Sequence, residues 1–294
     1  IPVETDQRVQ LPPGTLEEQY VALLDDYGVR FDSRAHMALS DIADGKHHSN
    51  WTPERMHECI ALMNENAGFV AQVQVLAAQD GSPLPWDFEV RYPRLSQHWD
   101  SGNILARLLR ADFVTAVAEE DRERAFEDVM ALLGMGDTFA AECKYDGYRT
   151  MLECYELAFE TLSEDIPPQF FRPEEIDAIC AHLRGAHHRE AFAASVANSL
   201  RGWIEMHERL DVRLFAKVNV ALGARYATEA FSLAQKPVHE AQCDLDTLTQ
   251  RVGGLPSVCD IVRRMMDMHL ELFDSQALHE TRIDLMHLGL LAEE

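Results

Sequence analysis

Apolar residues recur at helical spacing between Gly102 and Glu164, and this periodicity constrains the fold more than any other feature of the chain. A first stripe contains Ile104, Leu105, Leu108, Leu109, Phe113 and Val117. After a polar turn at 119–122, an answering stripe contains Ala125, Val129, Leu132 and Leu133. Spacings of three and four residues place side chains on one face of an α-helix. With Asp137 as the expected cap of a third helix that ends at Leu162, the segment predicts three consecutive amphipathic helices.

Helix signals also run through the rest of the chain. Thr15 and Glu18 form a capping box, and Thr52 followed by Pro53 is typical of a helix start. The first of these helices is expected to stop at Gly28. Towards the C-terminus, helices are expected over 173–184, 187–209, 211–235, 238–251, 257–277 and 279–292. No segment alternates as a strand does, so the sequence predicts an all-α fold, either an irregular multi-helix bundle or an α-solenoid-like stack of helical hairpins.

Two segments rich in proline interrupt the helical pattern. Segment 80–101 also carries Trp86, Phe88, Tyr92 and Trp99. We expect it to form a packed aromatic loop with a short strand over 87–91. Segment 165–173 is the best boundary, and it divides the chain into an N-terminal helical region, 1–164, and a C-terminal helical region, 165–294. A single continuous domain is compatible with the same pattern.

The charge balance restricts the kinds of partner. The chain of 294 residues has 50 acidic and 26 basic residues, a formal net charge of −24. A surface with this much negative charge repels phosphate backbones and anionic lipid headgroups. Nucleic acid is therefore not an expected partner. The apolar fraction of 47% is that of an ordinary globular protein. We therefore expect a folded acidic protein whose partner is a protein or peptide, with a basic one favoured.

The start of the chain and its cysteines bear on location. The sequence begins at Ile1 without an initiator Met, which favours a removed signal or anchor and a periplasmic or extracytoplasmic location. No segment approaches the roughly 20 apolar residues of a membrane span, so membrane attachment is expected only through a segment absent from this chain. The six cysteines form no CxxC pair. Buried thiols are expected, and a disulfide among the last three is the open alternative.

Two resemblances extend the reading of the helical segment. The acidic turn at 119–122 followed by the small residue Ala125 resembles a tetratricopeptide-type hairpin, although the first helix lacks the aromatic and glycine of that repeat. The aromatic segment 86–99, followed by the strings at 106–109 and 125–132, resembles a group of uncharacterised helical, tetratricopeptide-like proteins abundant in planctomycete-type bacteria. This resemblance covers residues 86–162. It implies a helical fold and an extracytoplasmic location, and it implies no activity.

The string Lys144-Tyr145-Asp146-Gly147-Tyr148-Arg149 resembles the KxDGxR motif of covalent nucleotidyltransferases, the ATP-dependent DNA ligases and mRNA capping enzymes. The resemblance implies that Lys144 is the nucleophile and that Arg149 holds the nucleotide. That family requires strands after the motif and a downstream pair of lysines one residue apart. Here the following residues continue a helical apolar stripe, and only Lys217 and Lys236 remain downstream. The favoured interpretation is therefore a helix with surface charges.

Two spacings suggest metal ligation. Glu54 and His57 form an ExxH pair, and Asp284 and His287 repeat the spacing with a shorter acid. Residues three apart share one helical face, and di-iron helical bundles combine two ExxH pairs with a Glu from each of two other helices. These four residues are the candidate metal ligands. Acids are abundant enough in this chain for such pairs to arise by chance, so the leading prediction includes no metal.

The sequence thus supports three functional hypotheses. The first is a non-enzymatic helical scaffold that binds a protein or peptide, with no cofactor. The alternative is a metal-carboxylate helical bundle with oxidase or metal-storage activity. The third and most distant is a nucleotidyltransferase that uses Lys144.

Overall fold

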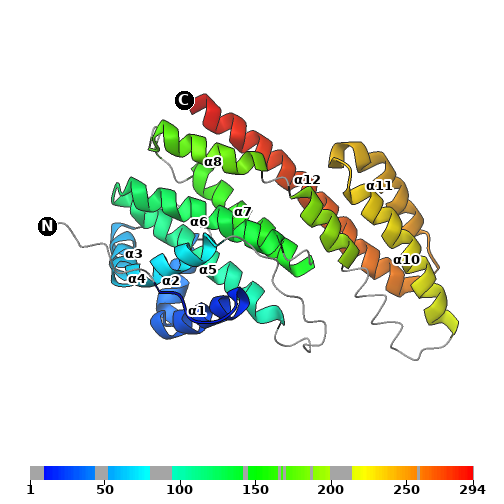
Figure 1. The fold of residues 1–294 in the computed structure, drawn as a ribbon, viewed down its shortest axis with the longest axis horizontal. Coiled ribbons are helices and arrows are strands. Elements are labelled where there is room, and N and C mark those ends of the chain that lie inside the picture. Colours follow the sequence, from blue (N-terminus) through cyan, green and yellow to red (C-terminus); the bar gives the residue numbers. More distant parts are fainter. Residues whose placement is uncertain are drawn as a thin grey trace. The chain divides into compact units, whose positions relative to one another are not determined.

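Helices make up nearly all of the regular structure. The computed structural model describes residues 10–43, 52–79, 95–141, 145–164, 167, 170–185, 188–198, 214–256 and 259–293. Within these residues there are helices and turns but no β-strand (Figure 1). The predicted all-α fold is therefore confirmed, as a multi-helix bundle. None of the described helices combines the length and the apolar character needed to cross a membrane.

The chain divides into two compact units that do not follow the order of the sequence. Unit 1 comprises Ile1–Phe139, Thr150–His182 and Met286–Glu294. Unit 2 comprises Ala140–Arg149 and Leu183–Leu285.

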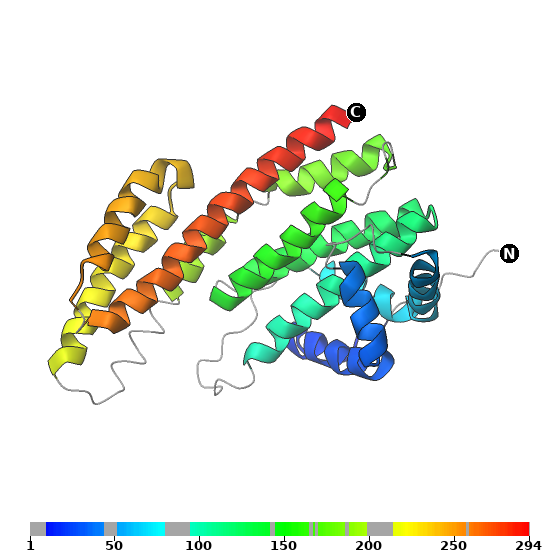
Figure 2. The same ribbon diagram turned by 180° about the vertical axis from the view of Figure 1, so that it is seen from behind.

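Unit 1 is built around α5. Its helices are α1 (Leu16–Arg30), α2 (Ser33–Ala43), α3 (Pro53–Glu65), α4 (Ala67–Ala77), α5 (Leu95–Ala118), most of α6 (Arg122–Ala140), most of α7 (Tyr145–Glu164), most of α8 (Pro173–Gly185) and the C-terminal end of α12 (Asp260–Glu293). The four N-terminal helices all contact α5. In Figures 1 and 2, α6 runs beside α5, so the two form a helical hairpin.

The predicted helix starts of unit 1 are confirmed in atomic detail. The backbone N–H of Thr15 donates to the Glu18 carboxylate over 2.8 Å, and the N–H of Glu18 donates to the Thr15 hydroxyl over 3.3 Å. Thr52 caps α3 by accepting from the N–H of Arg55 at 3.3 Å. These side chains bond amides that have no partner inside the helix, so the start of each helix is fixed locally.

Aromatic side chains form much of the unit 1 core. Tyr20 packs against Phe139 with ring centroids 5.3 Å apart, which joins α1 to α6. Phe31, at the end of α1, lies 6.1 Å from Phe69 of α4. Phe113 of α5 lies 6.5 Å from Phe171. Because such rings bury a large apolar area, these contacts between helices distant in sequence hold the bundle together.

Unit 2 contains a helix over 189–198, α10 (Leu214–Ala234), α11 (Val238–Gly253) and most of α12 (Asp260–Glu293). Helices α10 and α11 lie side by side in Figures 1 and 2 and contact each other. Phe192 links two further elements of this unit. Its ring lies 5.3 Å from that of Tyr148 and 4.9 Å from that of Phe273 in α12.

Several predicted helix boundaries are wrong. The helices expected over 257–277 and 279–292 are one helix, α12. Ser275, near the expected break, donates its hydroxyl to the backbone carbonyl of Glu271 at 3.0 Å and does not cap a new helix. Asp137 caps no helix either, because it lies inside α6. The first helix continues past Gly28 to Arg30, and α5 begins at 95, inside the segment expected as a loop.

Other predictions fall outside the described residues. These are most of the aromatic loop, 80–94, with its expected strand at 87–91, and the position of Lys144. Among the described cysteines none is joined in a disulfide: Cys59, Cys154, Cys180 and Cys259 are buried, and Cys243 is exposed. Burial raises the pKa of the Cys154 thiol, which keeps it protonated at neutral pH.

Two glycines of α6 permit close approach of neighbouring helices. A Cβ on Gly134 would lie 2.7 Å from the backbone carbonyl oxygen of Ala77, and one on Gly136 would lie 2.6 Å from the Tyr155 ring. Real Cβ atoms do not approach other atoms so closely. The glycines therefore lower helix propensity but allow α4 and α7 to pack against α6.

We expect Gly134→Ala to lower the free energy of unfolding by about 1–3 kcal/mol, because the backbone of α4 must move away from the new methyl group. Gly28→Ala is the matched control. Gly28 lies in α1, where an added methyl group would meet no neighbouring atom within 4 Å, so the control should gain about 0.5–1 kcal/mol from helix propensity. Urea denaturation measures both. Equal effects of the two changes would contradict a packing role for Gly134.

Candidate functional site

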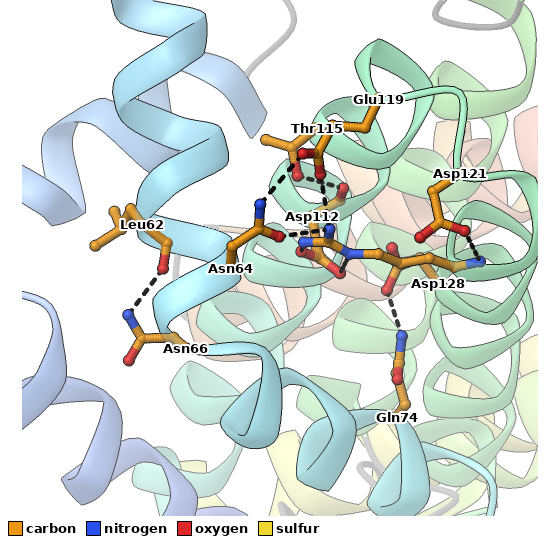
Figure 3. Close-up of polar contacts among 10 residues, drawn as sticks. Leu62, Asn64, Asn66, Gln74, Asp112, Thr115, Glu119, Asp121 and Asp128 are labelled. Atoms are coloured by element: carbon orange, nitrogen blue, oxygen red, sulfur yellow. Dashed lines mark hydrogen bonds and ion pairs between the residues drawn. The ribbon is translucent and has the colours of Figure 1, made fainter. Parts of the chain in front are cut away.

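An extended polar network of unit 1 surrounds Arg124, near the turn between α5 and α6. Figure 3 shows side chains from four helices converging there: Asn64 from α3, Gln74 from α4, Asp112 from α5 and Asp128 from α6. Asp112 and Asp128 have only 1% and 0% of their surface exposed. Because charged groups are rarely buried without a partner, this network is the first candidate for a functional site.

Arg124 forms hydrogen bonds through all three of its guanidinium nitrogens. Its Nε donates to Asp112 Oδ2 at 2.9 Å, and its second terminal nitrogen also pairs with Asp112, so the contact is bidentate. Its remaining nitrogen donates to Asn64 Oδ1 at 3.0 Å and to Glu119 Oε2 at 3.1 Å. Burial alone would lower the pKa of Arg124, but the bond with Asp112 and the nearby acidic charges raise it. The guanidinium therefore stays charged and fixed.

Asp128 lies at the end of the network that is fully buried. Gln74 donates to its Oδ1 at 2.8 Å (Figure 3). Complete burial, followed by the charge of Asp112, raises the pKa of Asp128 well above its usual range. Asp112 is also a hydrogen-bond partner that favours the protonated form of Asp128. The two carboxyls thus share one cation, Arg124, and the raised pKa favours a proton on Asp128 over a second negative charge.

The turn between α5 and α6 sets the register of these groups. Asp121 accepts from the backbone N–H of Arg124 at 3.3 Å and so starts α6. Glu120 adopts a φ of 58°, in the left-handed region that reverses the chain tightly. Arg124 and Asp128, four residues apart, then share one face of α6, opposite Asp112.

The chemistry open to this network is limited. Each guanidinium nitrogen of Arg124 already donates to a protein oxygen, and both buried carboxyls contact neighbouring side chains. A substrate group would have to displace one of these bonds and enter a buried space. The geometry therefore supports a structural joint between α3, α4, α5 and α6.

A second polar cluster joins α6, α7 and α8 in unit 1. The Tyr155 hydroxyl donates to Asp137 Oδ1 at 2.7 Å, and His182 Nε2 lies 3.0 Å from Asp137 Oδ2. The same His182 nitrogen lies 3.3 Å from the Tyr155 oxygen. Burial, together with the charge of Asp137, raises the pKa of Tyr155. A tyrosine that stays protonated and donates to a carboxylate forms a stabilising hydrogen bond between helices. The same protonated hydroxyl is a poor catalytic base.

Unit 2 has its own buried polar contacts. Glu280 of α12 accepts from Gln276 at 2.9 Å and lies 3.3 Å from an Arg189 nitrogen. Burial, and then the negative charge of Glu280, raise the pKa of Tyr148. The rings of His188 and His279 stack with centroids 5.9 Å apart. These contacts connect the helix over 189–198 to α12.

The candidate metal ligands Glu54 and His57 lie on the exposed surface of α3. Glu54 lies in the first turn of α3, where hydrogen bonds to the backbone and to the Thr52 side chain lower the pKa of its carboxyl. Asp284 is exposed on α12, and the side chain of His287 lies outside the described residues. Within the part of the chain that the structure describes, no three His, Cys, Asp or Glu side chains gather in a geometry for metal binding.

The described part of the KxDGxR-like string, from Tyr145 onwards, lies at the start of α7. Arg149 is exposed there, and the residues that follow it, up to 164, are helical. The strands on which the nucleotidyltransferase site depends are not found in this stretch.

Sequence reasoning missed the Arg124 network. The available signal was a set of charged residues at positions where an apolar stripe should continue. Asp112 lies next to Phe113, and Asp128 lies next to Val129. Opposite charges on two facing stripes indicate a buried pair, but only if the pairing of the two helices is known.

Comparisons of the chain with protein-family models, with curated proteins and with solved structures found no match. The functional argument therefore rests on the geometry of the described residues.

We expect Arg124→Met to lower the free energy of unfolding by about 3–5 kcal/mol, because it leaves Asp112 buried without a cation. The double change Arg124→Met with Asp112→Asn removes that charge and should recover part of the loss. Urea denaturation of the two variants gives the difference. If the double variant is as unstable as the single one, the ion pair is not the stabilising interaction.

The raised pKa of Asp128 predicts a specific pH dependence. The unfolded chain releases this proton near pH 4, at about its ordinary pKa, whereas the folded protein retains it to a higher pH. The free energy of unfolding therefore falls as the pH rises from about 4 to the folded-state pKa. Asp128→Asn keeps a neutral group that can accept from Gln74, so this variant should be more stable than the wild type at neutral pH and depend less on pH.

The measurement is urea denaturation at a series of pH values, with Asp246→Asn as the control. Asp246 is an exposed acid of α11, so its replacement should leave the curve unchanged. Parallel curves for Asp128→Asn and the wild type would show that Asp128 is not held protonated.

Proposed function

We propose that the protein is a helical module that binds another protein or peptide through the outward face of α12. The polar networks described above are formed by hydrogen bonds between neighbouring helices, which makes them suited to holding helices together. The face of α12 has the opposite character, because its side chains are open to solvent. The proposal rests on this face.

Six exposed residues of α12 in unit 2 form one continuous stripe, which contains Asp267, Glu271, Asp274, Leu278, Thr281 and Leu285. Arg264, one turn before the stripe, and Asp284, beside its end, are exposed as well. The two leucines are 51% and 62% exposed and lie two helical turns apart on the same side. The opposite side of the helix is buried and includes Val262, Met266, Phe273 and Ile283. Helix α12, orange to red in Figure 2, thus carries both kinds of residue, a buried apolar side and a separate exposed stripe, as the burial of its side chains shows.

Exposed leucines in register support a binding role. Solvent-exposed apolar side chains are common singly, but a repeated pair on one helix face is the arrangement that a partner helix covers. The surrounding acids keep the face soluble while it is open. A scaffold of this kind requires no cofactor, and the exposed positions of Glu54, His57 and Asp284 give no support to the metal-bundle alternative.

Binding should depend on the leucines of α12. A protein captured by cross-linking from the native source is purified, and its affinity for the wild type and for Leu278→Ser/Leu285→Ser is measured by calorimetry. The double variant should bind about tenfold more weakly or worse, because the apolar contact is lost. Val29→Ser/Met37→Ser removes two exposed apolar side chains from α1 and α2 and is the matched control. It should bind as the wild type does.

Three results would contradict the proposal. The first is a purified partner that binds both double variants equally well. The second is near-stoichiometric iron, manganese or zinc in protein that was never exposed to a nickel column, which would favour the metal-carboxylate bundle. The third is labelling of the chain by radioactive ATP that Lys144→Ala abolishes, which would favour a nucleotidyltransferase.

A further inference from the structure

We propose that the outward stripe of α12 docks a basic amphipathic helix of another protein, in coiled-coil register. This inference rests on the proposed function and adds the chemistry and the geometry of the partner. Its evidence is the spacing of the stripe, the division of its charges and the net charge of the chain.

The stripe has the spacing of a helix–helix seam. Its positions are 267, 271, 274, 278, 281 and 285, so the steps alternate between four and three residues. This alternation is the heptad pattern in which side chains of one helix insert between those of another. At a rise of about 1.5 Å per residue the stripe is about 27 Å long, enough to seat a partner helix of about five turns.

Charge is concentrated in the first half of the stripe. Asp267, Glu271 and Asp274 are exposed, and none of the three forms an ion pair within the described chain. The three residues follow one another at intervals of one helical turn, so they present a row of negative charge. Lysine or arginine at matching positions of a partner would complete this row, which favours a basic helix and sets its register.

The second half of the stripe contains its two leucines. Leu278 and Leu285 occupy equivalent heptad positions, and Thr281 lies between them. A partner helix whose lysines face the acidic row therefore lies against Leu278 and Leu285 with its other half. The matching sequence has basic residues in one half of its contact face and apolar residues in the other.

A second copy of this chain is a poor occupant of the face. Each copy has a formal net charge of −24, so association of two copies brings like charges together. A basic partner instead gains from the same charge, both in the rate of encounter and in the choice of partner.

The probe is a synthetic, fluorescently labelled helical peptide of about three heptads, with lysine at the contact positions of one half and leucine at those of the other. Its affinity for the full chain is measured by fluorescence anisotropy at low and at high salt. A second peptide with glutamate in place of lysine is measured in parallel. We expect the lysine peptide alone to bind, and its affinity to fall as salt increases.

Two charge-reversed variants test the site. Glu271→Lys/Asp274→Lys changes the stripe, and Glu240→Lys/Asp246→Lys changes two exposed acids of α11 by the same net charge. All four residues are exposed, so both variants should keep the fold, which circular dichroism checks. The α12 variant should bind the lysine peptide about tenfold more weakly, whereas the α11 variant should bind nearly as the wild type does.

Other outcomes overturn the inference. Equal weakening by both variants would mean that the peptide senses only the overall charge. Absence of binding, or equal binding of the glutamate peptide, would exclude a basic helical partner. A concentration-dependent dimer in analytical ultracentrifugation that Leu278→Ser/Leu285→Ser abolishes would make a second copy the occupant. If the native partner is sensitive to the leucine changes but not to Glu271→Lys/Asp274→Lys, the proposed function stands and this inference fails.

Discussion

The bidentate pair between Arg124 and Asp112 is the interaction on which the arrangement of unit 1 depends. A buried carboxylate is costly unless a cation and hydrogen bonds compensate it, so α5 and α6 are held in the single register that brings the two side chains together. Asn64 and Gln74 extend the same network to α3 and α4. One polar joint thereby aligns four helices whose apolar faces alone would tolerate small shifts. Apolar packing supplies most of the stability of such a bundle, and directional bonds supply its specificity.

The polar groups inside unit 1 differ in their surroundings from those on the outward face of α12. In the Arg124 network of unit 1, the guanidinium is paired with Asp112, and burial raises the pKa of Asp128 well above its usual range. Tyr155 and Asp137 form a comparable bond between α6 and α7. On the outward face of α12 the acids instead lie open to solvent beside exposed leucines. Closed polar networks suit a rigid support, and an open acidic and apolar face suits recognition, which is the basis of the function proposed for the chain.

Local signals in the sequence predicted local structure well. The capping box of Thr15 and Glu18 and the cap at Thr52 lie where the pattern placed them, because a cap depends only on residues within one turn. The same reasoning failed for Asp137, which has the chemistry of a cap but bonds Tyr155 from inside a helix. It failed again in α12, where no glycine or proline enforces the expected break near residue 278. A residue that can begin or end a helix does so only if tertiary contacts do not engage its side chain elsewhere.

The sequence by itself determined the fold class, the helical periodicity and the net charge of −24, since these follow from spacing along the chain and from the sum of its charges. Only the tertiary structure decided which charges are buried together. Asp112 and Arg124 are ordinary charged residues on their own helices and become a pair only when α5 and α6 face each other. In the same way, the tertiary structure decided that Leu278 and Leu285 face solvent, because an amphipathic pattern shows which residues share a face but not which faces find a partner.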